Sequence, residues 1–256
     1  PERARRCRSI SHGTNKQKAH KERVMGGIDQ ITEDRGRNNV RKPTVKNQDR
    51  KLIKALDNIQ KFYTSPGGKG KFYPSGGSLG NPCDRNLYLA YNGKLNSKLI
   101  EARISRIFKV GGSLEDRYDT YWNKLGILLD KEKTVRLTSP KISGRIDYIL
   151  SHEDPKIGKF ILELKSINKK GYDELIDVPK PEHHIQIQCY MGITGIPYGI
   201  VFYECKDDQS VRAFKVLHDE EMWQGIIDRC KRIMAMTEMP EECTGAPWCD
   251  CRVGRE

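Results

Sequence analysis

The sequence predicts an α/β domain in which a central mixed sheet is flanked by helices. Apolar residues recur at helical spacing in residues 46–125, five short apolar runs follow, and further helical patterns lie among and after these runs. The order helices, three strands, helix, two strands, helix is typical of one sheet covered by helices. The 256 residues, 36% of them hydrophobic, suit one sizeable domain with an appendage or at most two small domains.

The first 45 residues predict a basic arm rather than an independently folded unit. They contain few aliphatic residues that could be buried. The arm is either a solvated tail or a segment that orders on contact with nucleic acid or a protein partner. Basic residues crowd its first half, at Arg3, Arg5, Arg6, Arg8, Lys16, Lys18, Lys21 and Arg23.

Residues 46–80 predict a helix followed by a glycine-rich loop. A helix over 46–64 is indicated by apolar residues at helical spacing, at Leu52, Ile53, Leu56, Ile59 and Phe62. The loop from Ser65 to Gly80 lacks the Lys-Ser/Thr ending of a phosphate-binding loop, so it does not indicate a nucleotide site. We interpret it as a candidate mobile flap near a substrate.

Residues 81–251 predict the main domain. Helices are expected over 83–92 and 97–125, the second broken at Gly111-Gly112. The other elements follow in chain order: strands over 133–137, 144–150 and 160–167, a helix over 182–194, strands over 197–205 and 212–217, and a helix over 219–237.

Two consecutive predicted strands carry the residues that point to chemistry. Glu163 and Lys165 are two residues apart, so they share one face of an otherwise apolar strand, where charges are costly to bury without a purpose. Asp147 lies on the preceding strand, and residues 151–159 resemble a hairpin loop that would bring the two strands together. Asp147 and Glu163 can then converge on a hard divalent cation such as Mg²⁺ or Mn²⁺.

Such a site predicts hydrolysis of a phosphodiester bond by water that the metal activates. Lys165 would help to position or deprotonate this water, or stabilise charge on the phosphate. A Glu-x-Lys triplet alone is common, and the alternative is a surface hairpin with a Glu–Lys ion pair. The pair of Gly-Arg-Ile-Asp and Glu-Leu-Lys on consecutive apolar strands is much more specific.

At this point the chain resembles the PD-(D/E)XK nucleases. The residues that carry the resemblance are Gly144-x-x-Asp147, then Glu163-x-Lys165, then Gln186-x-x-x-Tyr190. The most similar branch is the RecB-like exonucleases, which include the CRISPR-adaptation nucleases with an iron–sulfur cluster. The resemblance covers roughly residues 80–251 and implies a restriction-endonuclease-like core.

The resemblance also implies roles for further residues. Glu115, in Gly111-Gly112-Ser113-Leu114-Glu115, stands where many relatives have His and would be a further metal ligand, together with the backbone carbonyl of Leu164. Gln186 and Tyr190, at a spacing that puts both on one helix face, would orient the substrate and the catalytic lysine.

The implied function is a metal-dependent deoxyribonuclease, in particular an exonuclease of recombination, repair or phage DNA replication. The expected partners are DNA and a helicase or other recombination or replication proteins. Two alternatives stay open. One is a non-cleaving nucleic-acid-binding protein with a metal cluster, and the other is a structure-specific endonuclease of the same fold, of the restriction or Holliday-junction type.

Three residues near these motifs have weaker signals. His183 and His184 adjoin the predicted helix over 182–194, and adjacent helical side chains diverge, so both cannot easily bind one metal. We expect a helix-start or substrate-side role for one of them. Lys206, at the end of the next strand, is either a phosphate contact or a solvated lysine.

The cysteines predict a metal centre. Cys243, Cys249 and Cys251 cluster in a polar tail where packing explains them poorly, and thiolates suit zinc or iron–sulfur clusters. With the distant Cys83, their layout resembles that of the iron–sulfur exonucleases and implies a [4Fe–4S] cluster. The terminal Cys-x5-Cys-x-Cys spacing departs from that pattern, so zinc or no metal remain alternatives. Three other cysteines are expected to be buried thiols, Cys189, Cys205 and Cys230.

Charge and hydropathy predict the compartment and the class of partner. Lys and Arg number 46 against 34 Asp and Glu, a net charge of +12 that fits a phosphate-rich partner. No run of roughly 20 apolar residues predicts a membrane span, and no apolar segment resembles a secretion signal. We therefore expect a cytoplasmic protein without lasting disulfides.

Overall fold

The computed structural model describes residues 50–64, 69–96, 98–243, 249 and 251. The predicted basic arm, residues 1–45, and Cys7 lie outside the described residues. In the described part, no helix has both the length and the apolar character required to cross a bilayer.

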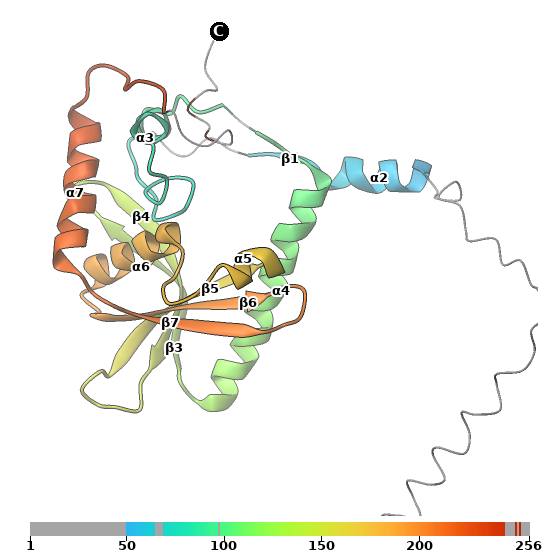
Figure 1. Cartoon of the computed structure of the whole chain (residues 1–256), viewed down its shortest axis with the longest axis vertical. Helices are drawn as coiled ribbons and strands as arrows, with labels where there is room; N and C mark the ends of the chain where they lie inside the picture. The colour runs from blue at the N-terminus through green and yellow to red at the C-terminus, as the bar shows by residue number, and fades with distance from the viewer. Residues whose placement is uncertain (1–49, 65–68, 97, 244–248, 250, 252–256) are drawn as a thin grey trace, which may run out of the picture. The chain divides into compact units, whose positions relative to one another are not determined.

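A five-stranded mixed sheet forms the centre of the described chain (Figure 1). Its strands are β3 (Leu128–Leu137), β4 (Ile142–Ser151), β5 (Lys159–Ile167), β6 (Tyr198–Cys205) and β7 (Val211–Leu217), adjacent in that order. Neighbours are antiparallel except β5 and β6, which are parallel because the connection between them crosses over through two helices. The predicted α/β class with a mixed sheet and five strands is confirmed.

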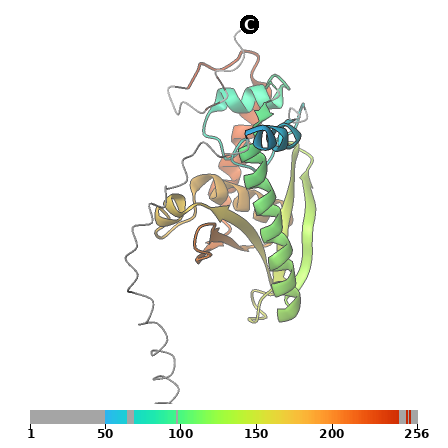
Figure 2. The same cartoon turned by 90° about the vertical axis from the view of Figure 1, so that its right-hand side faces the viewer.

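Helices cover both faces of this sheet (Figures 1 and 2). On one face, Leu114 and Tyr118 of α4 (Ala102–Leu125) pack on Leu162 and Leu164 of β5. On the other face, α5 (Lys169–Asp173) and α6 (Pro181–Thr194) pack on the alternate side chains, which include Ile161. The alternation of apolar side chains along β5 therefore gives the sheet two separate cores.

A third core lies beyond α6, where α3 (Asp84–Tyr91) and α7 (Glu220–Ala235) pack together. It includes Phe72 and Leu79 from the glycine-rich segment, both essentially inaccessible. Phe72 exchanges backbone hydrogen bonds with the start of β4 and stacks on Tyr91. Where a mobile flap was expected, residues 69–80 are held by apolar side chains in this core, and their mobility stays a prediction.

Two predicted helix boundaries are wrong. The helix α2 (Arg50–Gln60) ends before the expected residue 64, and the following β1 (Phe62–Tyr63) pairs with β2 (Leu99–Ile100), which replaces the expected start of the next helix. A two-residue strand depends on its distant partner, so helical spacing alone could not show it. Conversely, α4 runs unbroken through Gly111-Gly112, because glycine costs a helix only about 1 kcal/mol and packing on the sheet outweighs that cost.

Candidate active site

The two predicted catalytic strands pair as expected and bring their charged residues together. The antiparallel register of β4 and β5 places Tyr148 opposite Leu162. Asp147 Oδ2 accepts a hydrogen bond of 2.8 Å from the Leu164 N–H, and Lys165 Nζ donates to Glu163 Oε1. The Leu164 peptide group thus lies beside Asp147, while the ligand role of its carbonyl stays a prediction. Asp147, Glu163 and Lys165 form one group at the centre of the sheet.

Gln186 and Tyr190 join this group from α6. Gln186 Nε2 donates to Glu163 Oε1 at 2.8 Å and lies 3.3 Å from Tyr190 Oη. Tyr190 Oη donates to the Arg145 carbonyl on β4 at 2.8 Å. Gly144 permits this approach, because a Cβ atom there would lie 2.7 Å from Tyr190 Cε1. The helix is thereby fixed to both β4 and β5 by its polar side chains.

Burial and neighbouring charges shift the pKa values of all three residues in this group. Burial, and after it the neighbouring Glu163, raises the pKa of Asp147 to about 8. Burial also raises the pKa of Glu163, against the opposing effect of Lys165. Burial disfavours the ammonium of Lys165, but the charges of Glu163 and Asp147 outweigh it and raise the pKa of Lys165. One cation therefore faces two carboxyl groups, and a second positive charge would relieve their repulsion.

Glu163 has an oxygen without a partner. The side chain is 1% exposed, and its Oε1 atom takes the hydrogen bonds from Gln186 and Lys165. The Oε2 atom is buried and has no hydrogen-bond partner among the described residues. A buried carboxylate oxygen that is left unpaired costs several kcal/mol unless a cation or a proton meets it.

Glu115 lies near this group but is not part of a compact ligand set. It lines an acidic cavity together with Asp147, and burial followed by the Asp147 charge raises the pKa of Glu115. Among the described residues, the set of potential ligand side chains that converges in space is the four cysteines below, and Glu115, Asp147 and Glu163 form no comparable group. Its role as a ligand stays a prediction.

The two adjacent histidines take different environments, as expected from helix geometry. His183 Nδ1 lies 2.7 Å from the hydroxyl of Tyr203 on β6, whereas His184 Nε2 lies 3.4 Å from Gln188. Burial, and then the charge of Lys165, lowers the pKa of His183 to about 3, so its ring is neutral. No role in the site was predicted for Tyr203. Its position in a predicted buried strand could have indicated one, because a buried tyrosine hydroxyl needs a hydrogen-bond partner.

Lys206 lines a different cavity from the one that Asp147 lines. It lines a second cavity, on the α4 side of the sheet, together with Arg117 and Glu204. Glu204 is almost fully buried, pairs with Arg117 and accepts a 2.8 Å hydrogen bond from the Tyr118 hydroxyl. A phosphate contact of Lys206 stays a prediction.

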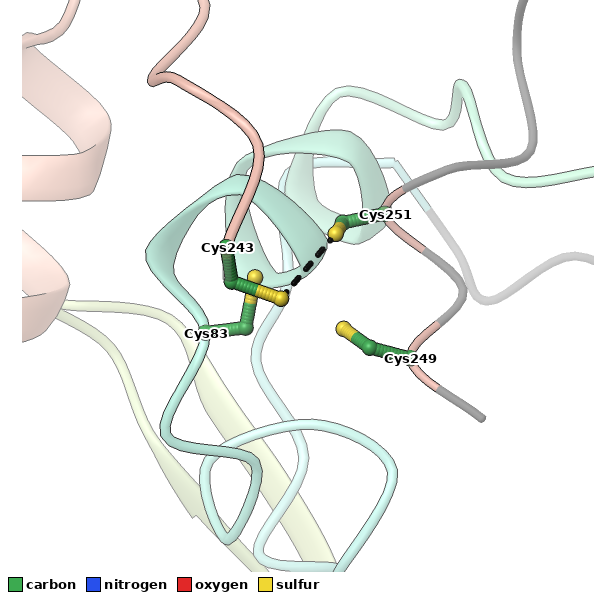
Figure 3. A group of neighbouring side chains, drawn as sticks. All are labelled: Cys83, Cys243, Cys249 and Cys251. Atoms are coloured by element: carbon green, nitrogen blue, oxygen red, sulfur yellow. Dashed lines mark hydrogen bonds between the residues drawn. The ribbon is translucent and has the colours of Figure 1, made fainter. Parts of the chain in front are cut away.

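The four predicted metal-binding cysteines converge in space (Figure 3). The sulfurs of Cys83, Cys243, Cys249 and Cys251 all lie within 4.8 Å of one another, and those of Cys243 and Cys251 are 3.3 Å apart. Burial first, and the neighbouring thiols after it, raises the pKa of Cys83 to about 12. This cysteine cluster could therefore bind a metal ion, whose positive charge would stabilise the thiolates. The other three cysteines of the described residues, Cys189, Cys205 and Cys230, are fully buried in the cores as predicted.

Arg85 holds the tail that carries the last cysteines. Its guanidinium donates to the Cys251 carbonyl at 3.0 Å and to the Pro240 carbonyl at 2.9 Å. Cys83 itself is the N-cap of α3, and its sulfur accepts from the Asn86 N–H at 3.4 Å. The cysteine cluster thus joins the start of α3 to the chain that follows α7.

Comparisons with known proteins find similar solved structures, all at low sequence identity. No family model matches the sequence, and no curated protein matches it. An alkaline exonuclease from Laribacter hongkongensis aligns at 19% identity with a TM-score of 0.40, over 48% of this chain and 64% of that one. The chain thus spans less than two thirds of that exonuclease.

Two other solved structures are similar. The protein SSO0001 aligns at 17% identity with a TM-score of 0.43, over 74% of this chain and 85% of that one. A phage-related exonuclease from Haemophilus somnus 129PT aligns at 15% identity with a TM-score of 0.36, over 48% of this chain and 66% of that one. The function must be argued from the chain's own residues.

Proposed function

We propose that this chain is a Mg²⁺- or Mn²⁺-dependent DNA nuclease that hydrolyses phosphodiester bonds, with exonuclease action in recombination, repair or phage DNA replication. The observation that carries the proposal is the buried Glu163 carboxylate. One of its oxygens, Oε1, accepts hydrogen bonds from Gln186 and Lys165, and the other, Oε2, is buried and has no hydrogen-bond partner among the described residues. A structural ion pair would satisfy both oxygens, whereas a ligand for a cation leaves one available.

The donor set fits a hard divalent cation. Asp147 and Glu163 would hold the ion through carboxylate oxygens, which Mg²⁺ and Mn²⁺ prefer, and Glu115 lines the adjoining acidic cavity. When bound, such an ion activates water and neutralises charge on a phosphate.

The chain's own residues then have separate tasks. Lys165 keeps its proton between the two carboxyl groups, so it supplies a fixed positive charge to a phosphate oxygen as negative charge develops there. Gln186 fixes the rotamer of Glu163, and Tyr190 fixes the helix to β4. Cleavage of a backbone phosphate needs no contact with bases, so sequence preference is not expected.

Digestion of end-labelled linear and circular DNA with Mg²⁺, Mn²⁺ or EDTA tests the proposal. We expect linear DNA to be degraded from its ends only when the metal is present. Cleavage of circular DNA would favour the endonuclease alternative, and binding without cleavage under every condition would favour the non-cleaving alternative.

Single substitutions identify the catalytic group. Asp147→Ala, Glu163→Ala and Lys165→Ala should each reduce cleavage on the order of 100-fold or more while the protein still folds. Glu153→Gln, an exposed acid in the β4–β5 loop, serves as the matched control and should cleave normally. Undiminished cleavage by purified Asp147→Ala would overturn the assignment.

For the cysteine cluster, the sulfur spacing supports a single tetrahedral ion such as Zn²⁺. With Zn–S bonds of about 2.3 Å, tetrahedral geometry places ligand sulfurs roughly 3.8 Å apart, and all four sulfurs here lie within 4.8 Å of one another. A [4Fe–4S] cluster, the centre implied by the sequence resemblance, would hold them further apart, because a cube of four irons lies between the ligands.

Metal analysis of anaerobically purified protein distinguishes these centres. One zinc per chain in a colourless sample is expected, whereas a brown sample containing four irons would establish the cluster instead. Cys83→Ala should lose the metal, and the buried Cys230→Ala should retain it. Neither zinc nor iron in the sample, with all four thiols freely alkylated in the folded protein, would remove the metal centre altogether.

A further inference from the structure

Three polar side chains of α6 form a row that crosses the central strands. Tyr190 contacts β4 through the Arg145 carbonyl, Gln186 contacts Glu163 on β5, and His183 contacts Tyr203 on β6. The spacings of three and four residues put all three on one face of the helix. Gln186 and Tyr190 are part of the proposed nuclease site, whereas the proposed function assigns no task to His183.

The hydrogen bonds around Tyr203 determine which nitrogen of His183 carries the proton. The Tyr203 hydroxyl is fully buried, and its oxygen accepts a 3.0 Å hydrogen bond from the Lys180 N–H. Its own proton needs an acceptor, and among the described residues that acceptor is His183 Nδ1 at 2.7 Å. A neutral ring that accepts at Nδ1 carries its proton on Nε2.

The Nε2–H group of His183 is available for a ligand. In the part of the chain that the structure describes, no hydrogen bond engages this nitrogen. His183 is partly exposed as a residue, whereas Tyr203, which its Nδ1 contacts, is inaccessible. We infer that the Nε2 edge of the ring is the part that a ligand can reach. Tyr203 is also the register partner of Lys165, so this edge belongs to the same end of β5 and β6 as the lysine.

From this geometry we propose that His183 is a substrate-binding residue that donates its Nε2–H to a phosphate oxygen of the bound DNA strand, next to the phosphate served by Lys165. The proposal rests on the proposed nuclease function for the identity of the ligand. A neutral donor suits this position, because a second full charge so near Lys165 would repel it. Tyr203 is then a positioning residue that acts by fixing the tautomer.

The tautomer can be observed directly by ¹⁵N NMR of the full chain labelled in histidine. We expect His183 to show a protonated Nε2 and an unprotonated Nδ1, and its Nε2 signal to shift when a short single-stranded oligonucleotide is added in EDTA. Tyr203→Phe should mix the two tautomers. A protonated Nδ1 in the wild type, or an Nε2 chemical shift that does not change when the oligonucleotide is added, would overturn the proposal.

Affinity for the same oligonucleotide, measured by fluorescence anisotropy in EDTA, gives the second test. His183→Phe removes the donor and should raise Kd about 10- to 100-fold, as expected for loss of a hydrogen bond to a charged group. His183→Gln places an amide N–H near the position of Nε2 and should stay within a few-fold of wild type, as should the neighbouring His184→Gln. Equal affinities of His183→Phe and His183→Gln would contradict the proposal.

These measurements need no cleavage. If the chain proves unable to cut DNA with any metal, the proposed function fails, and the NMR and affinity data still decide whether His183 binds the strand. If cleavage occurs and His183→Phe binds and cuts like wild type, the nuclease assignment stands and the inference about His183 fails.

Discussion

Two acids held side by side away from water cost the folded protein free energy. For Asp147 the cost depends on pH in a defined direction. Its pKa is raised from 3.8 to about 8 in the folded chain, so between these values the folded state binds more protons than the unfolded state. Stability contributed by the protonated form is therefore lost as the pH rises through this interval. A bound divalent cation would offset the loss.

Asp147→Asn should consequently stabilise the metal-free protein. The amide keeps an acceptor for the Leu164 N–H but has no charge to bury. We expect a gain in unfolding free energy on the order of 1–2 kcal/mol at pH 7, shrinking towards pH 4. Added Mg²⁺ should raise the Tm of the wild type and not that of the variant.

Urea unfolding at several pH values, with and without Mg²⁺, measures both effects. Glu153→Gln removes an exposed carboxylate and serves as the control, for which no such pH-dependent gain is expected. An Asp147→Asn protein that is less stable than wild type at pH 7 without metal would show that contacts within the protein, and not a cation, offset the cost of burying the carboxylate.

At the level of elements, the position of α6 depends on how closely α7 can approach it. Gly192 of α6 lies directly against the Trp223 ring of α7, and a Cβ atom there would overlap the ring. Trp223 also belongs to the core that includes Cys189 of α6. The glycine is therefore a packing requirement, and it keeps the helix that carries Gln186 and Tyr190 in place over the sheet.

Gly192→Ala should lower the free energy of unfolding by about 1–3 kcal/mol, since overpacking outweighs the better helix propensity of alanine. The matched control is Gly111→Ala in α4, where a Cβ atom would meet nothing within 4 Å. That variant should gain about 0.5–1 kcal/mol. Denaturant midpoints compare the two variants. A Gly111→Ala protein less stable than wild type would mean that α4 is not a continuous helix at this position in solution.

For the whole molecule, the basic arm should contribute more to DNA binding than to folding. It has little to bury and carries many positive charges, which displace counterions from phosphates. Deletion of residues 1–45 should weaken DNA binding and make its salt dependence shallower, by roughly 0.9 units of slope for each lost phosphate contact on duplex DNA. Titrations at several salt concentrations measure this, and unchanged affinity and slope would identify the arm as a tail.

The sequence by itself determined the central part of this protein. Alternating apolar residues made β4 and β5 recognisable, and a Glu and a Lys on one face of β5 could be proposed as a site before any contact was known. The cysteine cluster was also predictable, because thiols in a polar tail have no packing role. These features are readable because periodicity along one strand or helix directly reports which side is buried.

Only the tertiary structure decided what depends on contacts between distant segments. The pairing of Phe62–Tyr63 with Leu99–Ile100 and the anchoring of Phe72 are examples within the fold. In the site, the unpaired oxygen of Glu163 and the hydrogen bond between Tyr203 and His183 form only when α6 packs across the sheet. Hydrogen bonds join side chains whose separation in sequence carries no periodic signal, so the partner of a buried polar atom is set by packing and not by local pattern.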